Sequence, residues 1–335
     1  MRFSKMITCI DTHTCGEPTR IVTGGIGFIP GDTVAEKMLY FQENLDWLRT
    51  MLMHEPRGQS VMSGAILTEP CDPAADVGVI YLETGGYLPM CGHDTIGVCT
   101  ALVECGMVLV SEPVTVVTLE TPAGLVEGRV KVENGVAQSV TFTNAASFVY
   151  DKDIRADIQG LGEVTLDIAY GGNFFALVDA HDVGIKISPE YYWVIRRIGT
   201  KIKDAVNEVF PVVHPEKPFI NAVTHVYFIE QPVAPGMSGK SAAIITNGDV
   251  DRSPCGTGTC AELALMYSEK KIGLGEVFVN ESIIGTTLSA KVVSESSVSN
   301  FPAVICEVEG AAYITGFHNY VVDPMDPLKE GFLLQ

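Results

Sequence analysis

The chain has 335 residues, more than one compact core usually contains, so we expect two domains of roughly 150 residues each. Hydrophobic residues make up 47% of the sequence and charged residues 19%, an ordinary globular composition that argues against disorder. The formal net charge of −19 disfavours nucleic acids and anionic membranes as partners.

The N-terminal residues contain no sustained apolar core of the signal-peptide kind, and no apolar run reaches the roughly 18–20 residues of a membrane helix. The nine cysteines include no CxxC pair and no Cys/His cluster with zinc-finger spacing. We therefore expect a cytoplasmic protein with free thiols, without a metal site or a disulfide framework.

The elements alternate between short strands and a few helices. In chain order the patterns predict a helix over residues 34–48, strands over 78–83, 114–118, 139–143, 164–168 and 174–178, a helix over 191–209, and strands over 223–229, 242–246 and 304–308. Two more helices are expected over 96–104 and 260–271. This mixture predicts an α+β fold with curved sheets wrapped around helices.

A short internal repeat stands out. Cys91 and Cys255 each begin the pattern C-G-x-x-T, each follows a proline-containing turn, and each precedes one of the two helices expected over 96–104 and 260–271. The two copies lie about half the chain apart. This repetition suggests two duplicated halves, each with a cysteine at a helix N-terminus.

Such a position suits a reactive thiol. A helix N-terminus offers unpaired N–H groups and a partial positive charge, which favour thiolate and lower the pKa of cysteine. The same N–H groups can hold a carboxylate. Two thiols on opposite faces of one carbon could remove a proton from one face and deliver one to the other without a cofactor. We therefore expect Cys91 and Cys255 to form an acid–base pair.

Several segments resemble the proline racemase family. The two signature-like segments are Gly85–His93 and Asp251–Thr259, and the likeness continues in Asp11–Arg20, Glu55–Gly58, Tyr170–Phe175 and Ile314–Phe317, so it covers essentially the whole chain. The family includes proline racemases, 4-hydroxyproline 2-epimerases and trans-3-hydroxy-L-proline dehydratases.

The resemblance implies a diaminopimelate-epimerase-like fold. This has two similar domains, each a curved, mostly antiparallel sheet around a central helix, with the site in the interdomain cleft. We expect residues 1–172 plus 318–335 to form the N-terminal domain with Cys91, and residues 173–317 to form the C-terminal domain with Cys255. Members of this family are commonly dimers, so a homodimer is expected.

Roles follow from the resemblance position by position. Cys91 and Cys255 match the catalytic pair. The residues whose backbone amides hold the substrate carboxylate are matched by Gly92, His93, Gly256 and Thr257. Asp251 matches the acid that receives the ring nitrogen, and a desolvated ammonium does need an anionic partner. Asp94 departs from the family's usual residue, and we expect it to cap its helix.

The choice within the family depends on a few side chains. Dehydratases of the family typically replace one catalytic cysteine by threonine, so the two cysteines here favour inversion over elimination. Ser63 and His225 are both able to hydrogen-bond a ring hydroxyl, and plain proline would leave them unsatisfied. We therefore favour 4-hydroxyproline as the substrate, with proline as the alternative.

Two other classes of function stay open from the sequence. Cys91 and Cys255 could cycle through a disulfide in thiol redox chemistry, although no CxxC motif supports this. A non-catalytic protein that binds imino acids would need no pair of thiols.

Overall fold

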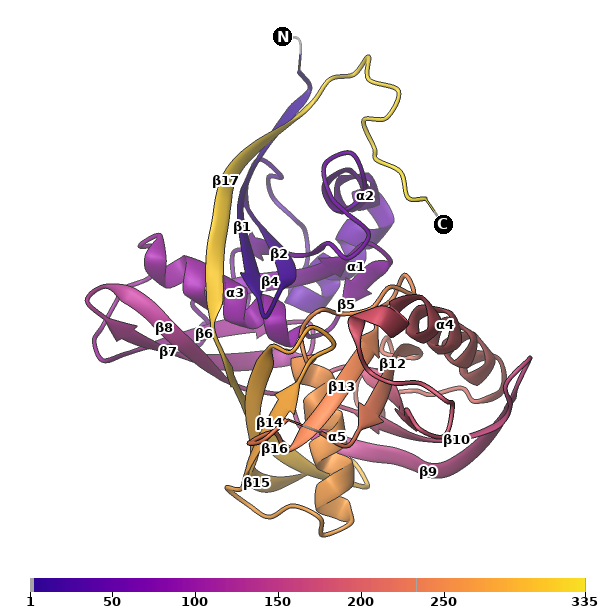
Figure 1. The fold of residues 1–335 in the computed structure, drawn as a ribbon. Helices are drawn as coiled ribbons and strands as arrows, with labels where there is room; N and C mark the ends of the chain where they lie inside the picture. Colours follow the sequence, from indigo (N-terminus) through magenta and orange to yellow (C-terminus); the bar gives the residue numbers. More distant parts are fainter. Residues whose placement is uncertain (1–2, 233, 335) are drawn as a thin grey trace. The chain divides into compact units, whose positions relative to one another are not determined.

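The structure is a computed structural model that describes residues 3–232 and 234–334 (Figure 1). The chain divides into two compact units, one formed by Met1–Phe142 with Ala311–Gln335 and the other by Thr143–Gly310. The sequence-based division after residue 172 lies 30 residues too late. The reason is that β9 (Ser147–Ile158) and β10 (Gly162–Tyr170) pair with each other, and β10 pairs with β11 (Phe174–Asp179) of the second unit.

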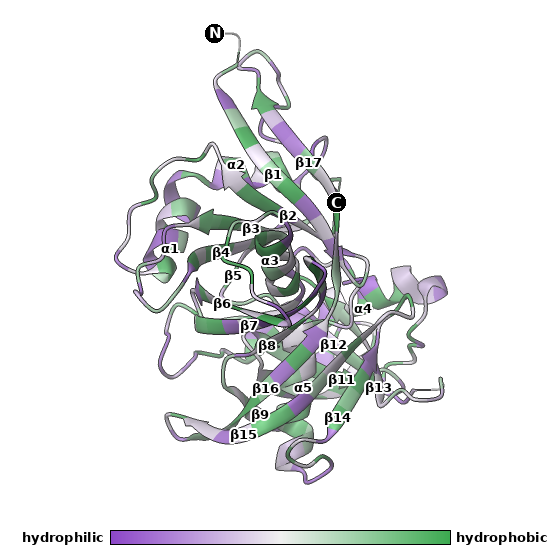
Figure 2. Ribbon diagram, turned by 90° about the vertical axis from the view of Figure 1, so that its left-hand side faces the viewer, coloured by the Kyte–Doolittle hydropathy of each residue, from purple (hydrophilic) through white to green (hydrophobic). Residues whose placement is uncertain are grey.

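The first unit is built mainly from strands, and its first and last strands come from opposite ends of the chain. Its strands are β1 (Lys5–Thr14), β2 (Glu17–Gly24), β3 (Ser63–Thr68), β4 (Val77–Glu83), β5 (Gly86–Leu88), β6 (Val114–Thr121), β7 (Gly124–Glu133), β8 (Val136–Thr143) and β17 (Ala312–Val322). The C-terminal β17 returns to pair antiparallel with β1 along its full length. Hydrophobic and hydrophilic residues are interleaved along both strands in Figure 2, as expected for strands with two different faces.

A buried helix lies at the centre of this unit. This is α3 (Gly92–Glu104), and every residue from Gly92 to Val103 is buried. It contacts β1, β2, β3, β7 and β17. A helix that is buried on all sides needs no amphipathic pattern, and the sequence Gly92–Glu104 has none. The approach of β1 is close, because a Cβ atom on Gly97 would lie 2.6 Å from Thr12 Oγ1.

The expected helix over residues 34–48 is two helices. These are α1 (Val34–Asn44), capped by the Thr33 hydroxyl, which accepts from the Glu36 N–H, and α2 (Asp46–Met53). The break falls at Leu45, whose backbone leaves the helical region. Asp46 then begins the second helix and forms an ion pair with Arg49 one turn later.

The second unit is a sheet closed on itself. Its further elements are η1 (Pro189–Tyr191), α4 (Tyr192–Val209), β12 (Val223–Glu230), β13 (Gly239–Ile244), α5 (Gly256–Ser268), β14 (Val277–Glu281), β15 (Thr287–Val298) and β16 (Phe301–Gly310). Neighbouring strands pair in order from β9 to β16, and β16 pairs back onto β9. The helix α5 contacts β9, β10, β11, β15 and β16.

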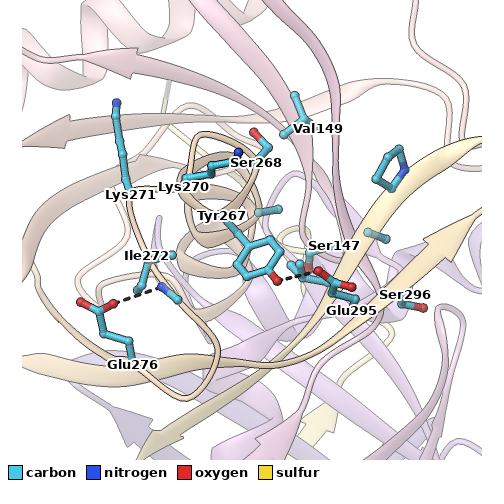
Figure 3. A pocket seen from close by; sticks show the side chains of 15 residues that line it. Ser147, Val149, Tyr267, Ser268, Lys270, Lys271, Ile272, Glu276, Glu295 and Ser296 are labelled. Atoms are coloured by element: carbon cyan, nitrogen blue, oxygen red, sulfur yellow. Dashed lines mark hydrogen bonds between the residues drawn. The ribbon is translucent and has the colours of Figure 1, made fainter.

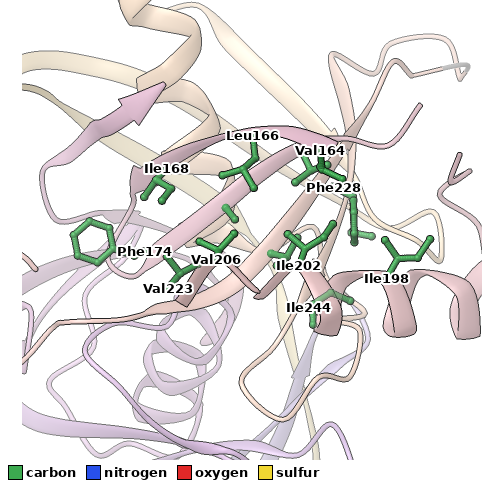
Figure 4. Packing of buried hydrophobic residues seen from close by; sticks show 14 of the residues in the cluster. Val164, Leu166, Ile168, Phe174, Ile198, Ile202, Val206, Val223, Phe228 and Ile244 are labelled. Carbon is green, nitrogen blue, oxygen red and sulfur yellow. The ribbon is translucent and has the colours of Figure 1, made fainter. Parts of the chain in front are cut away.

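The other long helix of this unit packs against the sheet by one face. Ile195, Ile198, Ile202 and Val206 recur at helical spacing on α4 and are buried. Figure 4 shows Ile198, Ile202 and Val206 against strand residues that include Leu166 and Phe228.

The architecture confirms the α+β class, with a sheet wrapped around one central helix in each unit. The predicted helices after Cys91 and Cys255 are these central helices, although each begins earlier than expected, directly after its cysteine. Across the described residues, no helix is long and apolar enough to cross a membrane.

Candidate active site

The first candidate thiol lies at the beginning of α3. Cys91 is the N-cap residue, has an extended backbone and is only 5% exposed. Thr95, the last residue of the C-G-x-x-T pattern, donates from its hydroxyl to the Cys91 carbonyl at 2.7 Å. Its hydroxyl also contacts the Tyr81 hydroxyl of β4 at 2.7 Å. The threonine therefore fixes the turn that presents the cysteine.

A line of polar contacts extends from the Cys91 sulfur. Its Sγ lies 3.4 Å from Nδ1 and 3.9 Å from Nε2 of His93. Nε2 of His93 lies 3.2 Å from Oδ1 of Asp94, although this oxygen accepts no hydrogen bond from the described residues. The other oxygen of Asp94 accepts from the Ser63 hydroxyl at 2.6 Å. All four side chains are buried. Asp94 thus does not act as the helix cap expected from the sequence.

The electrostatics at Cys91 differ from the expectation for a helix N-terminus. Burial raises the pKa of the Cys91 thiol, the charge of Asp94 raises it further, and His93 and the Asp94 N–H oppose this only in part. Burial alone would lower the pKa of His93, but Cys91 and Asp94 together raise it well above its ordinary value. The helix N-terminus therefore does not by itself make Cys91 a thiolate.

The second candidate thiol lies at the beginning of α5. Cys255 is the N-cap residue, is 6% exposed and has a φ of 61°, in the left-handed region that non-glycine residues seldom adopt. Such backbone strain is concentrated at functional sites. Thr259 repeats the role of Thr95, since its hydroxyl donates to the Cys255 carbonyl at 2.9 Å.

The surroundings of Cys255 are aromatic and apolar. It belongs to a buried cluster with Phe175, Leu177, Tyr227 and Ala243 from neighbouring strands. The Thr257 hydroxyl lies 3.8 Å from the sulfur. A Cβ atom on Gly258 would lie 2.5 Å from the Tyr227 ring. The Tyr227 ring therefore packs closely against Gly258, the position that matches Asp94 in the first motif.

The hydroxyl of Tyr227 is the centre of a buried polar network. It accepts from Asn280 Nδ2 at 2.7 Å and contacts the Thr259 hydroxyl at 3.3 Å. It also lies close to Glu262, whose pKa is raised to about 8 by burial. Tyr81 and Tyr227 thus hold the motif threonines Thr95 and Thr259 in the same way.

Asp251 is held in a tight turn before Cys255. It is 2% exposed, and its Oδ1 accepts from the Ser253 N–H at 2.7 Å. The Ser253 hydroxyl in turn accepts from the Cys255 N–H at 3.1 Å. These two bonds connect the carboxylate of Asp251 to the backbone of the cysteine.

His225 lies on β12, two residues before Tyr227. Successive side chains of a strand alternate between its faces, so His225 and Tyr227 share one face. His225 is 3% exposed, contacts the Phe175 ring at a centroid distance of 4.9 Å, and has Nδ1 2.8 Å from the Thr224 hydroxyl. His225 therefore lies on the same face of β12 as Tyr227, which packs in one buried cluster with Cys255.

The structure thus gathers the predicted site residues into two groups. Cys91, Gly92, His93 and Ser63 belong to the first unit, and Cys255, Gly256, Thr257, Asp251 and His225 to the second. Gly92, His93, Gly256 and Thr257 are buried first-turn residues, whose N–H groups have no acceptor within their helix.

The sequence reasoning missed several residues of these groups. Tyr81, Tyr227, Asn280 and Glu262 are distant in sequence from the motifs, and Asp94 was assigned to capping. A signal existed only for Asp94, because it is the one acid within either C-G-x-x-T pattern.

One set of side chains could hold a metal ion, contrary to the sequence-based expectation. Among the described residues, ligand atoms of Cys91, His93 and Asp94 lie within 4.8 Å of one another. Thiolate, imidazole and carboxylate are zinc-type ligands. The spacing of these residues matches no zinc motif, which explains why no metal site was expected from the sequence.

A cavity of about 760 Å³ lies elsewhere in the second unit (Figure 3). It surrounds Tyr267, Lys270 and Lys271 at the C-terminal end of α5, a helix about 20 Å long that has Cys255 at its other end. Tyr267 donates to Glu295 within it at 2.7 Å. None of the predicted site residues lines this cavity.

Comparison with known proteins agrees with the sequence motifs. A model of the proline racemase family matches residues 9–333. A proline racemase from Clostridioides difficile is 46% identical over the whole of both chains, and a 4-hydroxyproline 2-epimerase from Streptosporangium roseum is 48% identical over the whole of both chains.

Among solved structures, a hydroxyproline epimerase from Agrobacterium vitis with bound trans-4-hydroxy-L-proline is similar. It matches with a TM-score of 0.96 and 36% identity, over 100% of this chain and 96% of that chain. This likeness agrees with the fold expected from the sequence. The chain belongs to the proline racemase family and is an enzyme of the amino-acid racemase and epimerase class.

Proposed function

We propose that the chain inverts the α-carbon of a proline-type amino acid by a two-thiol mechanism that uses Cys91 and Cys255. The observation that carries this proposal is the repeated presentation of a cysteine. In each unit, a cysteine more than nine-tenths buried caps the central helix, with a threonine and a tyrosine holding the turn. Elsewhere in the chain no cysteine has this setting among the described residues.

The reaction needs one thiolate and one thiol. The thiolate removes the α-proton from one face, and the thiol of the other cysteine delivers a proton to the opposite face, so that the two exchange protonation states in each turnover. The first-turn N–H groups at Gly92, His93, Gly256 and Thr257 would hold the substrate carboxylate and stabilise the charge that develops on it. Asp251 would pair with the ring ammonium.

For the substrate we propose trans-4-hydroxy-L-proline, converted to cis-4-hydroxy-D-proline, with proline as the alternative. The Ser63 hydroxyl donates to Asp94, so it does not lack a partner when plain proline is bound. It keeps lone pairs that can accept from a ring hydroxyl. The preference therefore rests mainly on His225, a buried polar ring on the face that carries Tyr227.

The class of reaction is tested by polarimetry under reducing conditions, with L-proline and trans-4-hydroxy-L-proline supplied separately. We expect the optical rotation of trans-4-hydroxy-L-proline to change toward its 2-epimer, and proline to react more slowly. If neither compound changes in rotation and neither exchanges its α-hydrogen in D₂O, the proposal is wrong.

The choice of substrate is tested by His225→Phe, which removes the polar ring and keeps a planar side chain. We expect kcat/KM for hydroxyproline to fall by about tenfold relative to that for proline, the loss of one buried hydrogen bond. The control is His181→Phe, at a side chain that is 97% exposed. An equal loss for both substrates would contradict the role of His225.

The homodimer, the cytoplasmic location and the reaction without a cofactor stay predictions. Sedimentation of the purified protein would test the first, and activity after exhaustive dialysis against a chelator would test the last.

A further inference from the structure

Side chains hold the peptide groups on both sides of Cys255. The Ser241 hydroxyl donates to the Pro254 carbonyl at 3.1 Å, and the Thr259 hydroxyl donates to the carbonyl of the cysteine at 2.9 Å. The angles φ and ψ of a residue are the two rotations that orient the peptide groups before and after it. These two hydrogen bonds therefore act directly on the φ of 61° and the ψ of 96° at Cys255.

One buried amide supports both hydroxyl groups. Nδ2 of Asn280 on β14 donates to the Thr259 hydroxyl at 2.9 Å and to the Ser241 hydroxyl at 3.0 Å. It also donates to the Tyr227 hydroxyl at 2.7 Å, so its two protons are shared among three oxygens. An amide nitrogen only donates, and each hydroxyl therefore keeps its own proton for another partner. Asn280 in this way directs the hydroxyls of Ser241 and Thr259 toward the two carbonyls.

Three neighbouring strands bring these side chains together. Tyr227 on β12 pairs with Ala243 on β13, and Gly239 on β13 pairs with Asn280 on β14. Ser241 lies between Gly239 and Ala243, two residues from each, so alternation along β13 places it on the face that they share. The side chains of Tyr227, Ser241 and Asn280 are fully buried on this face.

The backbone of Cys255 needs such support. A φ of 61° suits glycine, but the proposed reaction requires a thiol at this position. A non-glycine residue keeps this conformation only where its surroundings hold it. Oδ1 of Asn280 is buried and accepts no hydrogen bond from the described residues, which carries a cost. The donor end of this side chain therefore accounts for an asparagine here.

From these contacts we propose that Asn280 is a positioning residue, which holds Cys255 in its left-handed backbone conformation through the hydroxyls of Ser241 and Thr259. This inference rests on the proposed function of Cys255. The conformation places the sulfur over the first turn of α5, 3.2 Å from the position of a Cβ atom on Gly258. Rotation of φ to an ordinary negative value would carry the sulfur away from this place.

The test is Asn280→Asp, which keeps the shape of the side chain and puts an acceptor where the donor was. An acceptor would draw the hydroxyl protons of Ser241 and Thr259 away from the two carbonyls. We expect a crystal structure of the variant to show a negative φ at Cys255, whereas the wild type keeps a φ near 61°. Polarimetry with hydroxyproline should show kcat reduced by about 10²-fold, the effect of a misplaced catalytic group, with KM little changed.

A purely structural role gives a different result. If Asn280 only fills space, Asn280→Asp unfolds at a lower temperature, but the folded variant keeps the wild-type kcat and the wild-type φ at Cys255. Either an unchanged kcat or an unchanged φ therefore overturns the proposal, as would a negative φ in the wild type.

Asn207→Asp is the matched control. Nδ2 of Asn207 donates to the carbonyls of Lys203 and Val223 at 2.9 Å and 2.8 Å, and so joins α4 to the beginning of β12. The control loses the same kind of donor within the same unit. It should unfold at a lower temperature and keep the wild-type kcat.

Two further measurements keep the test independent of folding and of the substrate. If Asn280→Asp fails to fold, Ser241→Ala removes only the bond to the Pro254 carbonyl and should lower kcat by a smaller factor. An unchanged kcat in Ser241→Ala would then overturn the proposal. Because φ is observed without substrate, a wild type that lacks epimerase activity would refute the proposed function, and the comparison of φ would still decide the role of Asn280.

Discussion

The region behind Cys91 and the region behind Cys255 begin from the same pattern and provide different surroundings. Both cysteines cap a central helix, and in both a threonine bonds the cysteine carbonyl while a buried tyrosine contacts that threonine. Beyond this shared part, Cys91 contacts a histidine paired with an acid, whereas Cys255 lies against aromatic rings on a strained backbone.

This difference teaches that the two units share the way in which the thiol is presented, and that they differ in the side chains that surround it. Two thiols that exchange roles need comparable proton affinities during turnover. The structure buries both cysteines, and it places the His93 ring 3.4 Å from the Cys91 sulfur and the Thr257 hydroxyl 3.8 Å from the Cys255 sulfur.

The largest effect is expected from removing either sulfur. Cys91→Ser and Cys255→Ser should each lower the rate of inversion by about 10²–10⁴-fold, because a serine hydroxyl is a much weaker acid than a thiol. Polarimetry with hydroxyproline measures this loss, and Cys105→Ser, a half-buried cysteine at the other end of α3, is the control. If only one of the two variants is impaired, the two thiols do not share the reaction.

The region behind Cys255 also holds a buried carboxyl group, that of Glu262. Burial raises the pKa of Glu262 from 4.5 to about 8, so the folded protein keeps it protonated at pH values where the unfolded chain loses the proton. Its contribution to stability is therefore present below pH 4.5 and is lost as the pH rises toward 8. Glu262→Gln should raise the free energy of unfolding by roughly 4 kcal/mol at pH 8.

Urea unfolding at pH 8 and pH 5 measures this gain in the free energy of unfolding, which should fall to roughly 1 kcal/mol at pH 5. Glu163→Gln is the control, because Glu163 is an exposed partner of Arg155. A variant that is less stable than the wild type at pH 8 would show that Glu262 is ionised and paired.

Two buried histidines give a similar comparison. Asp94 and Cys91 raise the pKa of His93, whereas burial among Phe148, Tyr170 and Phe174, helped by Lys217, lowers the pKa of His214 to about 4. The folded protein therefore keeps His214 neutral, and its contribution to stability is present above pH 6.5 and is lost as the pH falls toward 4.

The free energy of unfolding should therefore fall by about 3 kcal/mol between pH 7 and pH 4 because of His214, and His214→Gln should lack this fall. Unfolding free energies from pH 7 to pH 4 measure it, with the exposed His181→Gln as control. The same slope in both variants would mean that His214 takes up a proton in the folded state.

A smaller effect is expected from filling the space at Gly258. Gly258→Ala places a methyl group 2.5 Å from the Tyr227 ring, and such overpacking costs about 1–3 kcal/mol. Thermal unfolding measures the loss. Gly273→Ala should be tolerated, since its nearest atom would lie 3.8 Å away. If both variants unfold alike, the ring does not exclude an acid at position 258.

Much of this architecture could be predicted from the sequence. The C-G-x-x-T repeat predicted both central helices, and the apolar spacing of Ile195, Ile198 and Ile202 predicted α4. The contact between Ser63 and Asp94 could not be predicted, because it depends on where β3 lies beside α3. The raised pKa of Cys91 was missed for a similar reason, since the burial that outweighs the helix N-terminus depends on the complete fold.

The central claim is that two thiols act on one carbon, and a single experiment in D₂O tests it most directly. Starting from protonated trans-4-hydroxy-L-proline, the first turnovers should place deuterium at the α-carbon of the epimer and leave the recovered substrate protonated, because one group removes the hydrogen and another delivers the replacement. Early deuterium in the recovered substrate as well would indicate a single base that serves both faces, and would contradict the pairing of Cys91 with Cys255.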